Sequence, residues 1–430
     1  MTQTIHPSEE AMPVSFMQDV REQFRLSKNP ETLFPDAIVE TLTLGVNGID
    51  TKFYCISPQG DVDSTNTLNT GLLTDFVMYP DLIQASLDRN ERVLGMDFKH
   101  RVGGRRNVSR HHHDANIALY DYCKENTIKG EAYGKNGSGF VLHKMPDEET
   151  TGNKKQTLSG HSRGTAISPL LAKELADRGL ISPDDTVLEP INPVISDLSK
   201  RDLPFLAGTL FRHVVVDVAP PLAREAFGNL RELKRAYGED VTDEETARIR
   251  SPELLTKVRR AGALVRHLGG NLSSPTTIVK QSLDFLGGMS EDGVTYIGNV
   301  TESETDEDRL TYLGEYIKLA KKGYDIRMIV GAKDSLLPVS NETLEELINA
   351  GVTIAMTNDG HSEIMPDAKK YAKIFHFDEE KDYPTEEEVQ EFKEKLEESK
   401  DITNRLGHKV ANKLASFAVG RIREKFDLNV

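Results

Sequence analysis

The sequence predicts an α/β fold in which a mostly parallel central sheet is flanked by helices. Three observations support this prediction. Short apolar strand patterns alternate with helical patterns over residues 37–195 and again over 309–377. A Gly-x-Ser-x-Gly turn lies between one such strand and one such helix. The regular alternation stops after Pro193, a mainly helical insertion follows from about residue 196, and a helical extension follows the second stretch.

Four parts follow from this order of elements. A leader with one short helix precedes the core, the arginine-rich insertion divides the core, and the extension ends the chain. These parts are the leader 1–36, the core 37–195 and 309–377, the insertion 196–308 and the extension 378–430. Core strands are expected near 38–44, 52–57, 92–97, 155–159, 185–190, 324–331 and 352–356.

The C-terminal extension has two helical patterns. Thr385 opens a capping box before a highly charged helix, and a basic amphipathic helix follows it. Helices of the second kind bind membranes or partner proteins, and they also pack on the acidic body of their own chain. The sequence leaves open docking on its own body, a homodimer contact and a membrane surface.

The turn residues have the chemistry of an activated nucleophile. Gly160, His161, Ser162, Arg163 and Gly164 form the Gly-x-Ser-x-Gly pattern. A serine on a sharp turn between strand and helix has an exposed Oγ, and the helix N-terminus beneath it favours developing negative charge. The flanking glycines indicate a turn too tight for a β-carbon. The simpler alternative is that Ser162 only caps the helix.

An activated serine needs a histidine to accept its proton and a carboxylate to orient that histidine. Asp334 follows the apolar strand 324–331, and His361 follows the strand 352–356. Parallel strands bring their C-terminal loops to one edge of a sheet, so we expect both side chains near Ser162. Either residue has a local alternative role, Asp334 as the cap of a turn and His361 as a loop histidine. His376 and His408 are weaker candidates for the base.

With these motifs in place, the sequence resembles the α/β-hydrolases, which have a serine elbow, an acid and a histidine in the same chain order. The resemblance covers roughly residues 37–195 and 310–377. It extends to the strand and Gly-rich loop at 92–105 and to the turn Val46-Asn47-Gly48, which is similar to an opening hairpin. It implies that the insertion 196–308 is a cap over the site.

The resemblance also implies an oxyanion hole made of two backbone N–H groups. The residue after the nucleophile, Arg163, provides the first. Gly71 aligns with a family glycine in an early loop, so the amide of Leu72 or Leu73 is the candidate for the second. Residues 64–70 are a polar run where the family has an apolar strand, and a histidine of the family is missing.

The function implied by the resemblance is acyl transfer to Ser162, with His361 as base and then acid and Asp334 as its orienting group. A small carboxylic-ester substrate is implied, with no metal or organic cofactor. The same triad also serves amide, lactone, thioester or carbon–carbon bond cleavage, and the sequence does not separate these. The aspartate-nucleophile branches are disfavoured because residue 162 is serine. A non-catalytic binding or scaffold protein is the alternative of another class.

Two other clusters of polar residues have structural explanations that require no ligand. His111, His112 and His113 are consecutive, so their side chains diverge around a helix rather than converge on a metal. Asp114 is expected to cap a helix over 115–124. An arginine cluster fits a substrate carboxylate or phosphate, but a solvated loop that counters the acidic surface is the favoured interpretation. Its members are Arg101, Arg105, Arg106 and Arg110.

The composition limits the remaining classes of function. A net charge of −16 argues against bulk nucleic-acid binding, which needs a basic surface. No apolar run is long enough to span a membrane, and the N-terminus has no apolar signal region. Cys55 and Cys123 lie in apolar segments and are expected to be reduced, buried thiols of a cytoplasmic protein.

Overall fold

The computed structural model describes residues 16–36, most of the predicted core and part of the segment 196–308. The described residues are 16–60, 62–71, 74–97, 108–128, 139–142, 156–195, 228, 252–272, 312–331, 334, 337, 339–357, 360–361 and 394. The C-terminal extension lies outside these residues except for Glu394, so its dimer contact stays a prediction. Within the described part of the chain, no helix is long and apolar enough to cross a membrane.

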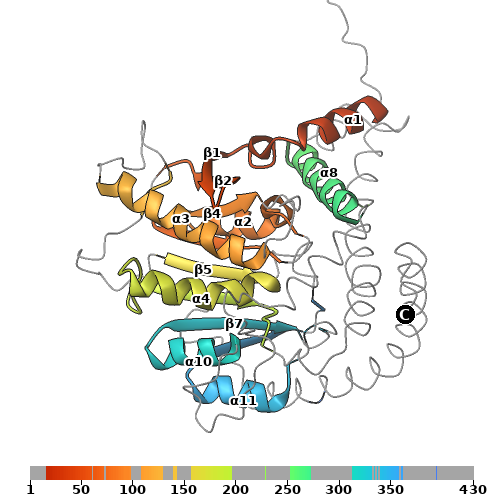
Figure 1. Cartoon of the computed structure of the whole chain (residues 1–430). Coiled ribbons are helices and arrows are strands. Elements are labelled where there is room, and N and C mark those ends of the chain that lie inside the picture. The colour runs from red at the N-terminus through yellow and green to blue at the C-terminus, as the bar shows by residue number, and fades with distance from the viewer. Residues whose placement is uncertain are drawn as a thin grey trace, which may run out of the picture.

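An eight-stranded sheet forms the centre of the molecule, with strand order β1-β2-β4-β3-β5-β6-β7-β8 (Figure 1). The first two strands form a hairpin, β2 pairs antiparallel with β4, and every other pair is parallel. This confirms the predicted mostly parallel sheet. The strands are β1 Ala37–Val46, β2 Ile49–Pro58, β3 Ser64–Asn69, β4 Glu91–Asp97, β5 Gln156–His161, β6 Thr186–Ile191, β7 Asp325–Gly331 and β8 Thr353–Thr357.

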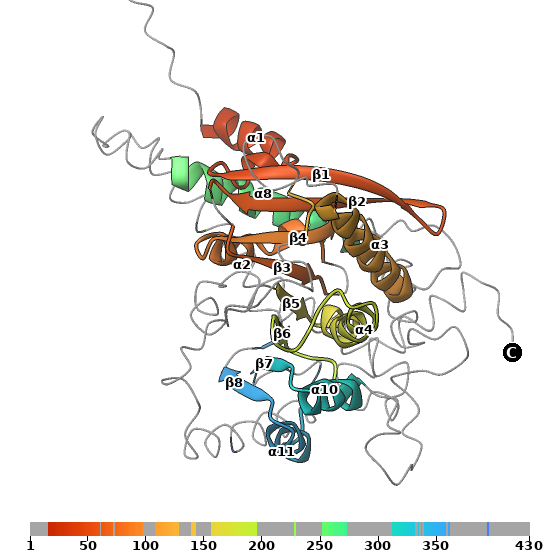
Figure 2. The same cartoon turned by 90° about the vertical axis from the view of Figure 1, so that its left-hand side faces the viewer.

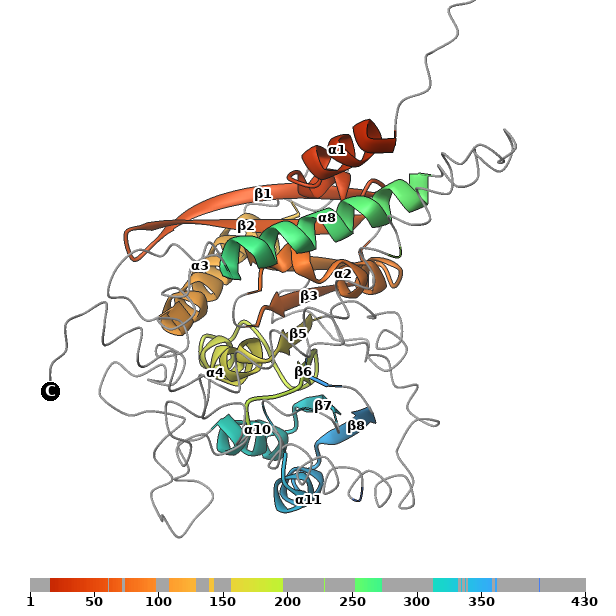
Figure 3. The ribbon, with the colours of Figure 1, turned by 90° about the vertical axis from the view of Figure 1, so that its right-hand side faces the viewer.

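Helices cover both faces of the sheet (Figures 2 and 3). One hydrophobic cluster joins the sheet to α3, α4, α10 and α11, and a second joins its other face to α2, η2 and the end of the leader. Alternate residues of a strand serve the two clusters: Phe53 and Cys55 belong to the first, and Tyr54 and Ile56 to the second. The full burial of a side chain such as Phe53 or Ile56 contributes roughly 1.5–3 kcal/mol to stability. The helices are α1 Phe16–Leu26, η1 Pro30–Thr32, η2 Phe76–Met78, α2 Pro80–Leu87, α3 Val108–Ile128, α4 Arg163–Asp177, α8 Pro252–Leu272, α10 Tyr312–Lys321 and α11 Asn341–Asn349.

Strand β3 is a central strand that apolar patterning does not reveal. All six of its residues are buried although five are polar. Their side chains form hydrogen bonds with neighbouring elements, which removes the cost of burying them. The polar run before Gly71 is therefore the strand that the family resemblance required. The bonds are Asn66–Ser86, Ser159–Asn66, Thr67–Tyr120, Asn69–Ser168, Asn116–Asn69, Arg92–Thr65 and Ser64–Glu91.

Helix α3 begins earlier than expected. It spans Val108–Ile128, so the prediction that Asp114 caps its N-terminus is wrong. Asp114 lies inside the helix, where it binds Arg110 one turn earlier and accepts a hydrogen bond from Asn47 of the opening hairpin. The three preceding histidines are all buried, although their side chains are polar. This turn of α3 is therefore enclosed by the rest of the protein.

Arginines of α8 bind the chain segment between α1 and β1. Helix α8 lies beside α1 (Figure 1). Arg259 donates to the Thr32 carbonyl at 2.8 Å, and Arg260 donates to the Leu33 carbonyl at 3.0 Å. The leader therefore continues into the second cluster, where Leu33 is buried. Charge-assisted bonds of this kind replace the hydration of the guanidinium groups.

The sheet also buries a carboxyl group on β6. Glu189 is 2% exposed, and among the described residues its Oε2 has no hydrogen-bond partner. Burial, and then the negative charge of Glu91, raise the pKa of Glu189 to about 8. The guanidinium groups of Arg89 and Arg327 oppose this shift, and the carboxylate of Asp325 adds to it. The carboxyl group of Glu189 is therefore mostly protonated, and so uncharged, in the folded protein at neutral pH.

Glu189→Gln is expected to flatten the pH dependence of stability. Between its ordinary pKa near 4.5 and about 8, the folded state keeps a proton that the unfolded state releases, so stability falls as pH rises. The slope is about 1.4 kcal/mol per pH unit for one group. Urea unfolding at pH 5 and pH 8 measures it, and the wild type should lose a few kcal/mol relative to the variant. Equal pH dependence in both proteins contradicts this assignment.

Candidate active site

Ser162 lies on a strained turn between two regular elements. Strand β5 ends at His161, α4 begins at Arg163, and Ser162 between them has φ 53° and ψ −120°. A positive φ is uncommon for a residue with a side chain and costs about 1–3 kcal/mol. The turn is held by the Ser162 N–H, which donates to the Ile191 carbonyl at 3.1 Å, and by the Thr165 N–H, which donates to the Ser162 carbonyl at 2.9 Å.

The two glycines of the motif make this turn possible. A β-carbon on Gly164 would lie 2.1 Å from the Asn69 carbonyl oxygen at the end of β3. On Gly160 it would lie 2.8 Å from both the carbonyl carbon of Gly164 and the Ser168 Oγ. Contacts this short require the backbone to move. Ser162 itself is 7% exposed.

The loops after β7 and β8 bring Asp334 and His361 together. The His361 Nδ1 lies 2.6 Å from the Asp334 Oδ2, and both side chains are at least 97% buried. The other carboxylate oxygen, Oδ1, accepts the Leu337 N–H at 2.8 Å. An ionised carboxylate only accepts, so the shared proton is assigned to Nδ1 and the lone pair of the neutral ring to Nε2.

His361 is held against the serine turn through its backbone. Its carbonyl oxygen lies 2.8 Å from the His161 Nε2 and accepts the Asn192 Nδ2–H at 2.7 Å. The rings of His161 and His361 are 5.1 Å apart between centroids. Asn192 follows β6 with φ 46°, and its Oδ1 accepts the Gly331 N–H at 2.9 Å. The serine, the acid loop and the histidine loop are therefore connected.

Of the candidate oxyanion donors, only Arg163 lies in the described residues, and Leu72 and Leu73 lie outside them. Arg163 is the first residue of α4, so its N–H has no acceptor four residues earlier within the helix. Its side chain is 1% exposed and donates from Nη2 to the His112 Nδ1 at 3.3 Å. Burial, and then this guanidinium, lower the pKa of His112 well below its usual value.

The three consecutive histidines of α3 have separate partners. His111 Nε2 lies 3.0 Å from the Thr51 Oγ1, and His113 Nδ1 lies 3.2 Å from the Asp114 Oδ1. In the described ranges no group of three or more His, Cys, Asp or Glu side chains is arranged to hold a metal ion. Both cysteines are free and buried, and burial raises the pKa of the Cys55 thiol to about 11.

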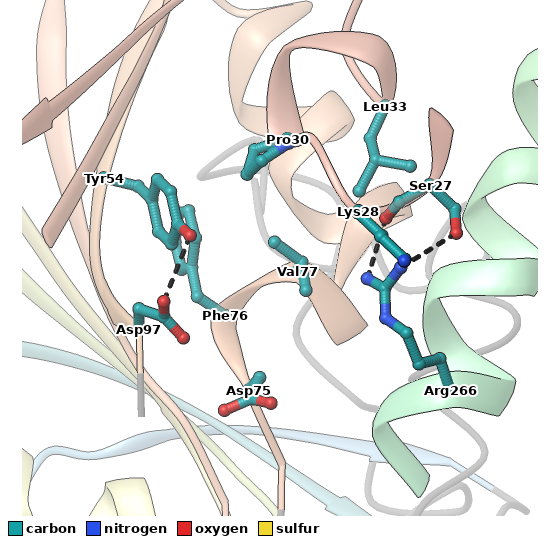
Figure 4. A pocket seen from close by; sticks show the side chains of 10 residues that line it. All are labelled: Ser27, Lys28, Pro30, Leu33, Tyr54, Asp75, Phe76, Val77, Asp97 and Arg266. Carbon is teal, nitrogen blue, oxygen red and sulfur yellow. Dashed lines mark hydrogen bonds between the residues drawn. The ribbon is translucent and has the colours of Figure 1, made fainter. Parts of the chain in front are cut away.

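A cavity of about 250 Å³ lies beside η2, between the leader and α8 (Figure 4). Arg266 reaches across it to Ser27, donating to the Oγ at 3.1 Å and to the carbonyl at 2.8 Å. On the opposite wall, the Tyr54 hydroxyl donates to Asp97 at 3.2 Å. The cavity lining contains neither Asp334 nor His361. It is Ser27, Lys28, Pro30, Leu33, Tyr54, Asp75, Phe76, Val77, Asp97 and Arg266.

Sequence reasoning missed two residues that contact the site, Tyr79 and Asn192. Asn192 carried a weak signal, because an Asn-Pro pair directly after a strand indicates a turn. Tyr79 carried none. Its hydroxyl lies 2.9 Å from the His161 Nδ1, and 82 positions separate the two residues in sequence. A contact of this kind is visible only in three dimensions.

No protein-family model matches the sequence, and neither does any curated protein. Among solved structures, an esterase from Pyrobaculum calidifontis is similar at 12% identity, with a TM-score of 0.42 over 90% of this chain and 92% of that one. The carboxylesterase CesB from Bacillus subtilis is similar at 14% identity, with a TM-score of 0.41 over 83% and 96% of the two chains.

A third similar structure is an N-formylmaleamic acid deformylase from Pseudomonas putida S16, at 13% identity and a TM-score of 0.41 over 78% of this chain and 99% of that one. These similarities are distant, so the fold is assigned from the topology of the sheet. Its strands are mostly parallel, the serine turn follows β5, and the loops after β7 and β8 meet beside it. This is the arrangement that the sequence resemblance implied, and the chain has the α/β-hydrolase fold.

Proposed function

We propose that this chain is a serine hydrolase that cleaves carboxylic esters through an acyl-enzyme on Ser162. The observation that supports this most is the buried hydrogen bond between the His361 Nδ1 and the Asp334 Oδ2. A carboxylate in this position fixes the imidazole tautomer that has its lone pair on Nε2 and stabilises the imidazolium that forms during the reaction. The strained turn of Ser162, between β5 and α4, is the second support.

The reaction has two halves. The His361 Nε2 accepts the proton of the Ser162 hydroxyl while Oγ attacks the ester carbonyl, and the resulting oxyanion is stabilised by backbone N–H groups. The imidazolium then returns the proton to the leaving alcohol as the carbon–oxygen bond breaks. Water repeats the sequence on the acyl-enzyme and releases the carboxylic acid. The Arg163 N–H and the amide of Leu72 or Leu73 are the proposed oxyanion donors.

A panel of chromogenic substrates tests the reaction class. It contains p-nitrophenyl esters of increasing acyl length, the matching thioesters and anilides, and a lactone. The proposal predicts a burst of p-nitrophenol stoichiometric with the protein, followed by slower turnover of the esters. A protein that is folded by circular dichroism and releases no product from any of them contradicts the ester-hydrolase proposal and favours the binding or scaffold alternative. If the protein prefers a thioester, an amide or a lactone, the proposed triad stands and the proposed substrate class changes.

The proposal also includes the insertion 196–308 as a cap over the site. Its helix α8 packs against η2, which begins at Phe76, shortly after the candidate oxyanion donors Leu72 and Leu73 in sequence. A cap at this place excludes water and selects substrates without providing the triad. Because Arg259 and Arg260 of α8 also hold the leader, the helix must be kept in any test of the cap.

Replacing residues 196–250 with a short Gly/Ser linker, with α8 retained, is expected to weaken the preference among ester chain lengths. Ser162 should still react with a small fluorophosphonate, because no proposed triad residue is removed. Rates on the ester panel and labelling of protein shown to be folded are the measurements. Unchanged chain-length selectivity in the folded variant contradicts the assignment of this segment as a cap.

A further inference from the structure

His161, the residue before the proposed nucleophile, contacts two loops with its two ring nitrogens. It is the last residue of β5 and is 2% exposed. Its Nε2 lies 2.8 Å from the carbonyl oxygen of His361. Its Nδ1 lies 2.9 Å from the hydroxyl of Tyr79, the residue that precedes α2. The ring therefore lies between the histidine loop and the segment that follows the candidate oxyanion loop.

The directions of these hydrogen bonds follow from the partners. A carbonyl oxygen only accepts, so His161 donates from Nε2–H, and in the neutral ring Nδ1 accepts. Tyr79 supplies that proton, since burial raises the pKa of its hydroxyl to about 12 and keeps it protonated. The Tyr79 oxygen in turn accepts the Gly71 N–H at 3.1 Å and lies 2.8 Å from the Thr74 Oγ1, which donates to it. Every polar atom of this chain of bonds is satisfied without a buried charge.

Gly71 and Thr74 bracket the two candidate oxyanion donors, and both bind the same tyrosine hydroxyl. The packing at Gly71 is close. A β-carbon there would lie 3.1 Å from the His161 Nδ1 and 3.2 Å from the Tyr79 hydroxyl. A side chain at residue 71 would press on the bond between His161 and Tyr79. The glycine is therefore explained by this contact as well as by the family resemblance.

We propose that His161 is a positioning residue that sets the spacing between His361 and the two residues that flank the candidate oxyanion donors, Gly71 and Thr74. It acts through the Tyr79 hydroxyl on one side and the His361 carbonyl on the other. This inference rests on the proposed function, because the spacing matters only if His361 is the base and Leu72 or Leu73, between Gly71 and Thr74 in sequence, supplies an oxyanion donor. Misplacement of a catalytic group by about 1 Å costs on the order of 10²-fold in rate.

Two substitutions remove the contact between His161 and Tyr79, one from each side. His161→Gln keeps an N–H at the position of Nε2 and loses the contact with Tyr79, and Tyr79→Phe removes that contact from the other side. Each is expected to lower kcat by roughly 10- to 100-fold with KM little changed. Tyr79→Phe also removes the hydroxyl that binds Gly71 and Thr74. The double variant is expected to be no slower than the slower single variant, because the bond that His161→Gln removes is among those that Tyr79→Phe removes. The rate of fluorophosphonate inactivation should fall in parallel with kcat.

Tyr120→Phe is the matched control. Tyr120 is also buried, and its hydroxyl lies 2.9 Å from the Thr67 Oγ1 on the face of the sheet that α3 covers. Its loss should lower the unfolding midpoint as Tyr79→Phe does but leave kcat within about twofold of the wild type. All rates are measured well below the unfolding midpoint of each variant.

The outcomes distinguish this inference from the proposed function. A folded wild type that neither reacts with fluorophosphonate nor turns over esters overturns both. An active wild type in which Tyr79→Phe and Tyr120→Phe have equal kcat overturns the positioning role alone. Additive losses in the Tyr79→Phe/His161→Gln double variant also overturn it, since independent effects do not arise from one shared bond. If His161→Gln fails to fold, Tyr79→Phe against Tyr120→Phe decides the matter.

Discussion

Ser162→Ala is expected to abolish ester turnover, with kcat lowered on the order of 10⁴- to 10⁶-fold, as for loss of other triad nucleophiles. The fold should remain, because the contacts that hold the turn use backbone atoms of residue 162. The Thr165 N–H donates to its carbonyl, and its own N–H donates to Ile191, and alanine keeps both bonds. Initial rates on a p-nitrophenyl ester and thermal unfolding of the same preparation are the measurements.

Ser64→Ala is the matched serine truncation for this experiment. Ser64 lies at the opposite end of β3 from Asn69, the residue that contacts the serine turn. It donates to Glu91 at 3.1 Å, so its loss should cost about 1 kcal/mol of stability and leave kcat unchanged. If Ser162→Ala retains more than about a tenth of the wild-type rate, another residue is the nucleophile.

Asp334→Asn is expected to lower kcat by roughly 10³- to 10⁴-fold while the loop keeps its shape. The two carboxylate oxygens accept from different donors, Oδ1 from the Leu337 N–H and Oδ2 from the His361 Nδ1. An asparagine has only one acceptor. If it keeps the bond to Leu337, its NH₂ faces Nδ1, and the ring must move its proton to Nε2, where a base is needed.

The steady-state rate of ester hydrolysis measures this effect, and Asp359→Asn is the control. Asp359 lies two residues before His361 in sequence and outside the described residues. The Asp359→Asn substitution is expected to leave kcat nearly unchanged. A large loss in Asp359→Asn with a near-neutral Asp334→Asn would move the orienting role from Asp334 to Asp359.

The sequence predicts most of the sheet because burial and periodicity coincide there. Strands β7 and β8 are apolar and end at loops, and the chemistry of Asp334 and His361 in those loops pointed to their contact. Strand β3 escaped the same reasoning, since Asn66 and Thr67 look like loop residues until their partners from α2, α3 and β5 are known. Hydrophobicity alone cannot identify a strand whose polar groups are satisfied by distant residues.

In the candidate active site, too, local features could be predicted from the sequence and contacts between distant residues could not. The glycines around Ser162 indicate a tight turn, because the required close approach is local to the motif. The network through His161 and Tyr79 was not predictable, since it joins residues that are 82 and 200 positions apart in the chain. The burial of Glu189 was equally hidden, because its strand reads as apolar around a single charged residue.

The central claim is that Ser162 is an activated nucleophile, and the mass of the protein after exposure to a fluorophosphonate tests it most directly. The proposed function predicts one adduct per chain, mapped by peptide sequencing to Ser162, with none on Ser162→Ala and slow formation on Asp334→Asn. The rate of this reaction depends on the serine, its base and the orienting acid together, and it can be measured without knowing the natural substrate. A folded wild type that forms no adduct, or forms it on another residue, contradicts the claim.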